Sequence, residues 1–332
     1  MNWELLGHEW AVDLLKRHLL EDGLRHAYLF SGSPGIGRRT LALRFIQALN
    51  CPTPLSPGEP CLSCKVCKQI ERQQYPDLNI VQAEQEGKEI KIDQVRGLQH
   101  SLSLAPYESK YRIALLLGFH NANANAQNAM LKTLEEAPSR VILLVTSDSL
   151  EGLLPTITSR CEVLRLRPVP LERVALYLRD KQKLDSQQAR VFAHLSEGRP
   201  GFALRLLDNP AELEKRQAFL DQAPVLLHVP RRARFAYVET LTRDKDKARE
   251  NLRLALQVWL SYWRDILICC SGADTPLVNL QKEAEVRQIA GSLTLAAICQ
   301  VVNAIETGLE QLEANANTRL LGEVLLLDWP ML

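Results

Sequence analysis

The sequence predicts an α/β protein with a parallel sheet and flanking helices in its first half, followed by an all-helical second half. Strand and helix patterns alternate along residues 1 to about 166, which is typical of a parallel sheet covered by helices. A glycine-rich turn connects the first of these strands to a helix, as in phosphate-binding loops. From Pro168 onward, strand signals largely vanish.

The first half contains five apolar runs with the length and composition of strands. We expect these strands at residues 27–31, 78–81, 112–117, 141–146 and 162–166. Between them, helical periodicity predicts helices over residues 10–20, 39–49, 92–103 and 125–136. Pro138 cannot continue a helix, so it marks the end of the last one.

The second half is expected to form two helical parts. Residues 171–207 have the pattern of a small helical module, and residues 211–332 that of a longer all-helical domain with apolar faces such as Leu252, Leu256 and Trp259. A chain of 332 residues with 46% hydrophobic residues is long enough for two or three domains with buried cores.

Charge and hydropathy exclude some classes of function. The 40 Lys and Arg residues nearly balance 39 Asp and Glu residues, which argues against a large DNA-wrapping surface. The N-terminus lacks a basic segment followed by an apolar core, and no stretch approaches the roughly 20 apolar residues needed to span a bilayer. We therefore expect a cytoplasmic protein with no membrane partner.

The glycine-rich turn keeps the outline of a P-loop but lacks its chemical groups. The run is Gly32-Ser33-Pro34-Gly35-Ile36-Gly37-Arg38-Arg39-Thr40, with Arg38 at the position of the Lys and Arg39 at that of the Mg²⁺-binding Ser or Thr. A guanidinium cannot ligate a cation. The residues expected to contact phosphate, if nucleotide binds at all, are Gly32, Gly35, Gly37, Arg38, Arg39 and Thr40.

The second half of a P-loop metal site is missing as well. A working ATPase would end the strand at residues 112–117 with one or two carboxylates, but Gly118-Phe119-His120 follows it. Two independent losses predict that the chain has no ATPase activity of its own. The alternative is that the turn was never a nucleotide site, since glycine-rich strand-to-helix turns also serve ordinary packing.

Four cysteines form a local cluster with the spacing C-x9-C-x2-C-x2-C. They are Cys51, Cys61, Cys64 and Cys67. Four thiolates complete the tetrahedral shell of Zn²⁺ and leave no position for water or substrate, so we expect a structural zinc site. The alternatives are disulfides, which a reducing cytosol disfavours, and an iron–sulfur cluster, which also takes four cysteines.

Three further segments resemble the bacterial AAA+ clamp-loader family. They are Asn128-Ala129-Met130-Leu131-Lys132-Thr133-Leu134-Glu135-Glu136-Ala137-Pro138, Leu154-Pro155-Thr156-Ile157-Thr158-Ser159-Arg160-Cys161, and His26-Ala27-Tyr28-Leu29-Phe30 before the loop. The four-cysteine module after the loop's helix fits the bacterial members, and residues 312–320 are similar to the last helix of the family's collar domain. The chain is most similar to a member whose nucleotide site is degenerate.

This resemblance implies a domain plan and a set of partners. The plan is an AAA+ core at 1–166 with the cysteine module at 51–67, a helical lid at 167–208 and a helical collar for oligomerisation at 209–332. The implied partners are gamma- or tau-like ATPase subunits and a delta-like subunit in a hetero-pentamer of the DNA polymerase III holoenzyme. Through that complex the chain would act on the sliding clamp and on primer–template DNA, at a replisome on the nucleoid.

The resemblance also implies individual roles. Arg160 matches the arginine that reaches the γ-phosphate of ATP held by a neighbouring subunit, as an arginine finger in trans. A solvated arginine or a structural salt bridge is the alternative. In the lid, Gly201 falls where active members carry a second sensing arginine, while Arg199 and Arg205 nearby are expected to be lid surface or a displaced sensor.

Three functions follow from these observations. The first is a non-hydrolysing clamp-loader subunit that acts as a stator and supplies Arg160 in trans. The second is a competent gamma- or tau-like ATPase that uses Arg38 on the phosphates and an unrecognised acid for the metal. The third is a zinc-dependent nucleic-acid-binding module, for which Lys65 and Lys68 around the cysteines are too few.

Overall fold

The computed structural model describes residues 3–21, 23–85, 88–138 and 140–332. The chain divides into two compact units. The first consists of Met1–Tyr177 with Gly198–Phe202, and the second of Leu178–Glu197 with Ala203–Leu332.

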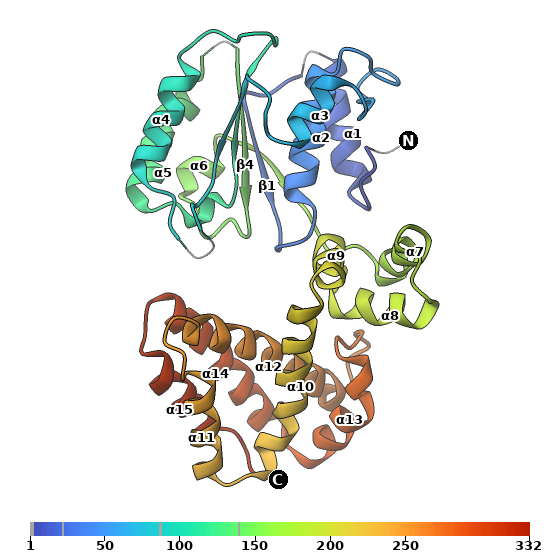
Figure 1. The fold of residues 1–332 in the computed structure, drawn as a ribbon, viewed down its shortest axis with the longest axis vertical. Coiled ribbons are helices and arrows are strands. Elements are labelled where there is room, and N and C mark those ends of the chain that lie inside the picture. Colours follow the sequence, from blue (N-terminus) through green and yellow to red (C-terminus); the bar gives the residue numbers. More distant parts are fainter. Residues whose placement is uncertain (1–2, 22, 86–87, 139) are drawn as a thin grey trace. The chain divides into compact units, whose positions relative to one another are not determined.

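A five-stranded parallel sheet forms the centre of the first unit (Figure 1). Its strands, in chain order, are β1 (Ala27–Ser31), β2 (Leu78–Val81), β3 (Arg112–Leu116), β4 (Val141–Ser147) and β5 (Glu162–Arg165). Their spatial order is β2-β3-β4-β1-β5, and every neighbouring pair is parallel. All five predicted strands are confirmed to within one residue. Because β1 lies between β4 and β5, the loop that follows β1 emerges beside the carboxyl ends of both strands.

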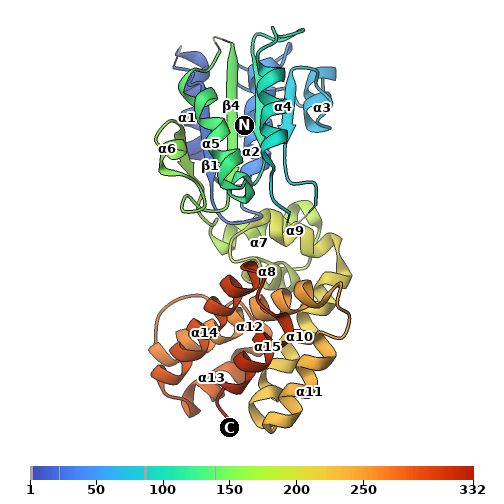
Figure 2. The same ribbon diagram turned by 90° about the vertical axis from the view of Figure 1, so that its left-hand side faces the viewer.

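Helices cover both faces of this sheet, as Figures 1 and 2 show. On one face lie α1 (Glu9–Leu20), α2 (Arg38–Asn50) and α3 (Lys65–Glu71). On the other lie α4 (Ile92–Leu102), α5 (Ala124–Glu135) and the short α6 (Pro155–Thr158). The four predicted helices are confirmed, while α3, α6 and the 3-10 turn η1 (Phe119–Asn121) were not predicted.

The core of the first unit follows the alternation of side chains along each strand. Tyr28 and Phe30 of β1 are buried under the α1–α2 layer, and Ala27 and Leu29 face the α4–α5 layer. Since both faces of β1 are buried, its continuous apolar run is what a central parallel strand requires.

Helices α7 (Leu171–Gln182) and α9 (Pro200–Asp208) each have residues in both units. The other helical elements of the second unit are α8 (Ser186–Leu195), α10 (Pro210–His228), α11 (Arg231–Leu241), α12 (Ala248–Ser271), η2 (Leu280–Lys282), α13 (Glu283–Ser292), α14 (Leu295–Glu313) and α15 (Thr318–Leu327).

The core of the second unit is built around three tryptophans. The ring of Trp329 meets those of Trp259 and Trp263 edge-on, with centroids 5.2 and 5.4 Å apart. The predicted apolar face of Leu252, Leu256 and Trp259 is buried in this core.

Among the described residues, no single helix has the length and apolar composition to cross a membrane. One bent pair of helical segments, Leu280–Ser292 with Leu295–Glu313, reaches that length and composition only when the two are taken together.

Candidate functional site

The loop between β1 and α2 has the backbone of a glycine-dependent turn. Gly32, Gly35 and Gly37 have φ angles of 153°, 81° and 111°, values that favour glycine. Gly37 directly precedes the first turn of α2. The three glycines picked out in the sequence therefore lie where the backbone needs them, and the loop joins strand to helix as expected.

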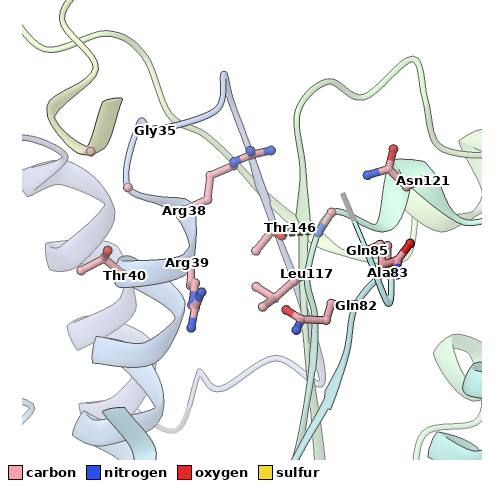
Figure 3. Close-up of a pocket in the computed structure, with 13 residues that line it drawn as sticks. Gly35, Arg38, Arg39, Thr40, Gln82, Ala83, Gln85, Leu117, Asn121 and Thr146 are labelled. Atoms are coloured by element: carbon pink, nitrogen blue, oxygen red, sulfur yellow. Dashed lines mark hydrogen bonds between the residues drawn. The ribbon is translucent and has the colours of Figure 1, made fainter. Parts of the chain in front are cut away.

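A pocket of about 450 Å³ opens beside this loop (Figure 3). Its lining is Gly35, Gly37, Arg38, Arg39, Thr40, Gln82, Ala83, Gln85, Leu117, Gly118, Asn121, Thr146 and Gly201. Except for Gly32, every expected phosphate-contacting residue lines it. No carboxylate is found among these described lining residues, so the pocket lacks the hard oxygen ligands that Mg²⁺ prefers.

Arg38 is held by an acid that the sequence did not reveal. Its Nη1 lies 2.5 Å from Oδ1 of Asp148, the residue immediately after β4, and its side chain is only 13% exposed. The contact is an ion pair without hydrogen-bond geometry, because Nη1 is buried and has no aligned acceptor. The arginine at the Lys position thus already has an anionic partner within the chain.

The described residues that directly follow β3, from Leu117 to His120, include no carboxylate. Gly118, Phe119 and His120 follow the strand, and the Gly118 N–H donates to Thr146 Oγ1 at 2.8 Å. His120 lies beside Asp148: its Nδ1 accepts the Asp148 N–H at 3.2 Å, and its Nε2 is 3.7 Å from the carboxylate. The acid that the ATPase hypothesis requires would be Asp148, but Arg38 already neutralises its charge.

Arg39 and Thr40 do not rebuild a metal site. The Arg39 guanidinium contacts the side-chain amide of Gln73, just beyond α3, and Figure 3 shows the side chains of Arg38, Arg39 and Thr40 leaving α2 in different directions. Thr40 is exposed. A hydroxyl at this position has no carboxylate in the described pocket lining with which to share a cation.

The start of α9 lies directly on the loop. The Gly201 N–H donates to the Gly35 carbonyl at 2.8 Å, and a Cβ at Gly35 would come within 2.6 Å of the Phe202 nitrogen. At Gly201 a Cβ would be 2.9 Å from the Gly35 oxygen. Only glycines allow this approach of two backbones, so an arginine at position 201 would not fit without a shift of the loop.

The two nearby arginines have partners of their own. Arg199 lies over the ring of Phe202, with 4.7 Å between the guanidinium carbon and the ring centroid. Arg205 forms an ion pair with Glu212 at 3.1 Å.

Arg160 lies at the surface just after α6. Its Nη1 donates to the Thr156 carbonyl at 3.0 Å, and its Nη2 is 2.7 Å from Oε1 of Glu135, the last residue of α5. The side chains of Arg160 and Glu135 are 35% and 49% exposed. Arg160 does not line the pocket beside the P-loop, so it is a separate feature of the first unit.

The four cysteines come together at the far end of α2 from the loop. Cys51 directly follows α2, Cys64 caps the N-terminus of α3, and the four sulfur atoms all lie within 4.8 Å of one another. Tetrahedral Zn²⁺ with bonds of about 2.3 Å to sulfur places its ligands about 3.8 Å apart, so the cluster fits a closed zinc site.

Hydrogen bonds to the sulfur atoms of this cluster favour the thiolate form that binds a cation. The N–H groups of Cys61, Cys64 and Cys67 point to sulfur atoms of the cluster at 3.3 to 3.4 Å, and Thr53 donates to Cys61. The Thr53 hydroxyl and the backbone N–H groups lower the pKa of Cys61 to about 5, which favours the thiolate that metals bind. Burial raises the pKa of Cys67.

The cysteine module is fastened to the rest of the first unit at several points. The Trp3 indole donates to the Gly58 carbonyl at 2.9 Å, and Lys16 of α1 pairs with Glu59 at 2.6 Å. Gln47 of α2 donates to the Cys67 carbonyl at 2.8 Å. The module therefore packs on α1 and α2 rather than extending freely.

Comparison with known proteins agrees with this architecture. Residues 7–170 match the family model described as DNA polymerase III, delta subunit, and residues 210–330 match the model of the C-terminal part of the same subunit. Together the two models match more than half of the chain.

Individual relatives cover most of the chain. The delta' subunit of DNA polymerase III from Bacillus subtilis is 29% identical over 96% of this chain and 94% of its own length. The gamma subunit from Buchnera aphidicola subsp. Schizaphis graminum is 25% identical over 81% of this chain and 78% of its own. A gamma-subunit-related protein of known structure from Thermotoga maritima aligns with 95% of this chain and 97% of its own at 16% identity and a TM-score of 0.43.

Proposed function

We infer that this chain, which belongs to the DNA polymerase III delta-subunit family of clamp-loader proteins, is a non-hydrolysing stator that supplies Arg160 in trans to a neighbouring ATPase subunit. One observation carries the proposal. Arg38 of the P-loop is paired with Asp148 inside the chain, beside a pocket whose described lining has no carboxylate, whereas Arg160 remains at the surface.

The absence of hydrolysis follows from the charges around the pocket. Phosphoryl transfer from ATP needs a cation to neutralise the charge that develops on the β- and γ-phosphates. Arg39 stands in place of the hydroxyl ligand, His120 stands in the segment of the expected carboxylate, and Asp148 is engaged by Arg38. The contact of Gly201 with Gly35 also leaves no room for a sensing arginine.

Arg160 has the properties that a trans-acting arginine needs. Its planar guanidinium can bridge two phosphate oxygens, and its only charged partner among the described residues, Glu135, is half exposed and forms a weak surface pair. An arginine supplied to a neighbour's γ-phosphate contributes roughly 10³–10⁵ in rate where such fingers are known. Arg160 would therefore act on a neighbour's ATP rather than on this chain's own pocket.

The remaining parts of the proposal concern assembly. The neighbours would be gamma- or tau-like ATPases and a delta-like subunit in a hetero-pentamer, with the sliding clamp and primer–template DNA met through that complex. We assign the core to residues 1–166, the lid to 167–208 and the collar to 209–332. Zn²⁺ on Cys51, Cys61, Cys64 and Cys67 would stabilise the module that packs on α1 and α2, without a part in the reaction.

A reconstituted complex tests this function. Arg160→Ala is expected to leave assembly intact, to lower the clamp- and DNA-stimulated ATPase in part, and to slow clamp loading further, because loading needs all subunits to close together. The exposed Arg96→Ala in α4 serves as the matched control, since Arg96 is 67% exposed. A complex with Arg160→Ala that assembles normally and loads clamps at the unmodified rate would show that Arg160 is merely structural.

A further inference from the structure

We propose that Arg38 and His120, which stand where an active enzyme has its catalytic Lys and its metal-binding acid, are positioning residues that fix the segment Asp148–Leu154 and, through it, Arg160. The inference rests on the proposed role of Arg160. The degenerate pocket then has a function of its own. Its residues do not catalyse hydrolysis of a nucleotide in this chain, but they position the arginine that contacts the ATP of the neighbouring subunit.

The first contact is at the beginning of the segment. Asp148 is the first residue after β4, and its carboxylate is 2.5 Å from the Arg38 guanidinium. Arg38 is the first residue of α2 and is nearly buried, so its guanidinium has little freedom to move. This ion pair therefore ties the start of the segment to the rigid loop–helix junction.

The second contact comes from the end of β3. His120 accepts the Asp148 N–H through Nδ1 at 3.2 Å, and a Cβ added to Gly152 would lie 2.8 Å from the His120 Cβ. Glycine at position 152 thus lets the segment close onto the histidine. One side chain touches the segment at both its first residue and its fifth.

Helix α5 holds the end of the segment. The buried Gln127 donates through Nε2 to the Gly152 carbonyl at 3.1 Å, and its Oε1 accepts the Leu154 N–H at 2.9 Å. Leu154 is the residue before α6, and Arg160 follows that one-turn helix by two residues. These bonds link the position of the segment to the residue before α6 and so to the base of Arg160.

The chain offers a closely matched control for Arg38. Arg44 also belongs to α2 and pairs with Glu71 at 2.5 Å, with side-chain exposures of 14% and 50% against 13% and 37% for Arg38 and Asp148. Arg44 is separate from the segment 148–154, since its partners among the described residues are Glu71 of α3, Trp3 and Gln47. Loss of either arginine removes one ion pair of similar burial from the same helix, and loss of Arg44 removes its hydrogen bonds to Trp3, Gln47 and Glu71 as well.

Hydrogen exchange of the full chain tests the contact directly. Arg38→Ala and His120→Ala should each speed amide exchange in residues 148–154 by about fivefold, the size expected when one partly exposed ion pair or one neutral hydrogen bond is lost, while Arg44→Ala should leave that segment unchanged. Arg38→Lys should restore part of the protection, because an ammonium can still pair with Asp148. Unchanged exchange in 148–154 after Arg38→Ala, or the same increase after Arg44→Ala, would overturn the proposal.

A double-mutant cycle in the reconstituted complex separates positioning from general destabilisation. Arg38→Ala should lower the neighbour's turnover without changing its KM for ATP, and adding it to Arg160→Ala should cause no further loss. Additive losses would refute positioning through Arg160. If Arg160→Ala itself leaves turnover unchanged, the proposed function fails, and the exchange rates alone decide whether Arg38 and His120 fix the segment.

Discussion

The guanidinium of Arg160 lies 2.7 Å from the carboxylate of Glu135, so the arginine that we propose to act on another subunit's ATP has an ion-pair partner in its own chain. Glu135 ends α5, where a negative charge meets the negative end of the helix dipole, and Arg160 relieves that repulsion. Both side chains are exposed enough for water to screen the pair, which limits its contribution to about 1 kcal/mol or less. Such a contact can hold Arg160 near its proposed working position and still release it.

Glu135→Gln tests how Arg160 is released. If Arg160 must leave Glu135 to reach a neighbour's phosphate, this variant should raise the ATP turnover of the complex by no more than about fivefold, the equivalent of about 1 kcal/mol. Steady-state ATPase measured over a range of ATP concentrations checks this. A loss of activity as large as that of Arg160→Ala would instead make Glu135 part of the working geometry.

The isolated chain is expected to hydrolyse no ATP above background, with or without Mg²⁺. The double substitution Arg38→Lys and Arg39→Thr restores the P-loop residue types. It should not create ATPase activity, because the described pocket lining supplies no carboxylate that could bind Mg²⁺ together with the threonine hydroxyl. A coupled phosphate-release assay measures both proteins. The contrary result is turnover by the unmodified chain that Arg38→Ala abolishes.

The sheet and its main helices could be predicted because each depends on short-range patterns. The five strands are apolar runs buried on both faces, and α1, α2, α4 and α5 have clear helical periodicity. Helices α3 and α6 could not be predicted because seven and four residues are too few for a periodic signal. Their positions are set by neighbours: Cys64 caps α3, and Gln127 holds the residue before α6.

The candidate site was predictable in its parts but not in its pairings. Spacing alone indicated the glycines of the loop and the four cysteines, which the structure brings together. Asp148 was not predicted because a P-loop motif places the acid at the end of β3, whereas the partner of Arg38 follows β4, far away in the chain. The parallel order β3-β4-β1 places these strand ends side by side, and a linear motif does not contain that information.

The cysteine cluster is expected to hold one Zn²⁺ per chain. Cys64→Ser should abolish metal binding and lower the thermal stability of the protein by several degrees or more, because metal binding and folding of such a module are coupled. Metal analysis of protein purified under reducing conditions, followed by thermal unfolding, tests this. Cys299→Ser, in α14 and outside the cluster, should retain the zinc. Iron in place of zinc, or no metal, would contradict the prediction.

A buried arginine in the second unit should be essential for stability. Arg234 is 1% exposed and donates to the carbonyls of Leu326, Trp329 and Pro330 at 2.7 to 2.9 Å. Arg234→Met leaves these carbonyls unpaired, at about 1–3 kcal/mol each, so we expect the free energy of unfolding to fall by about 3 kcal/mol or more. The exposed Arg232→Met should change it by less than about 0.5 kcal/mol. Denaturant unfolding curves that do not distinguish the two variants would refute this.

Arg160→Lys separates charge from geometry at the proposed trans site. Both side chains carry one positive charge, but only the guanidinium presents a planar fork of donors that matches two phosphate oxygens. We expect the lysine variant to assemble normally and to recover little of the turnover and clamp loading that Arg160→Ala loses. Single-turnover ATP hydrolysis and clamp-loading rates should be measured for the three complexes in parallel.

The isolated chains provide the internal check on that comparison. Arg160 is about one-third exposed, and its polar contacts are with Thr156, Ser159 and Glu135, so neither substitution should change the free energy of unfolding by more than about 1 kcal/mol. A lysine that restores full loading would show that Arg160 acts as a simple positive charge. A loss of folding free energy in the isolated chain that accounts for the loss of clamp-loading rate would show that Arg160 acts only through the fold.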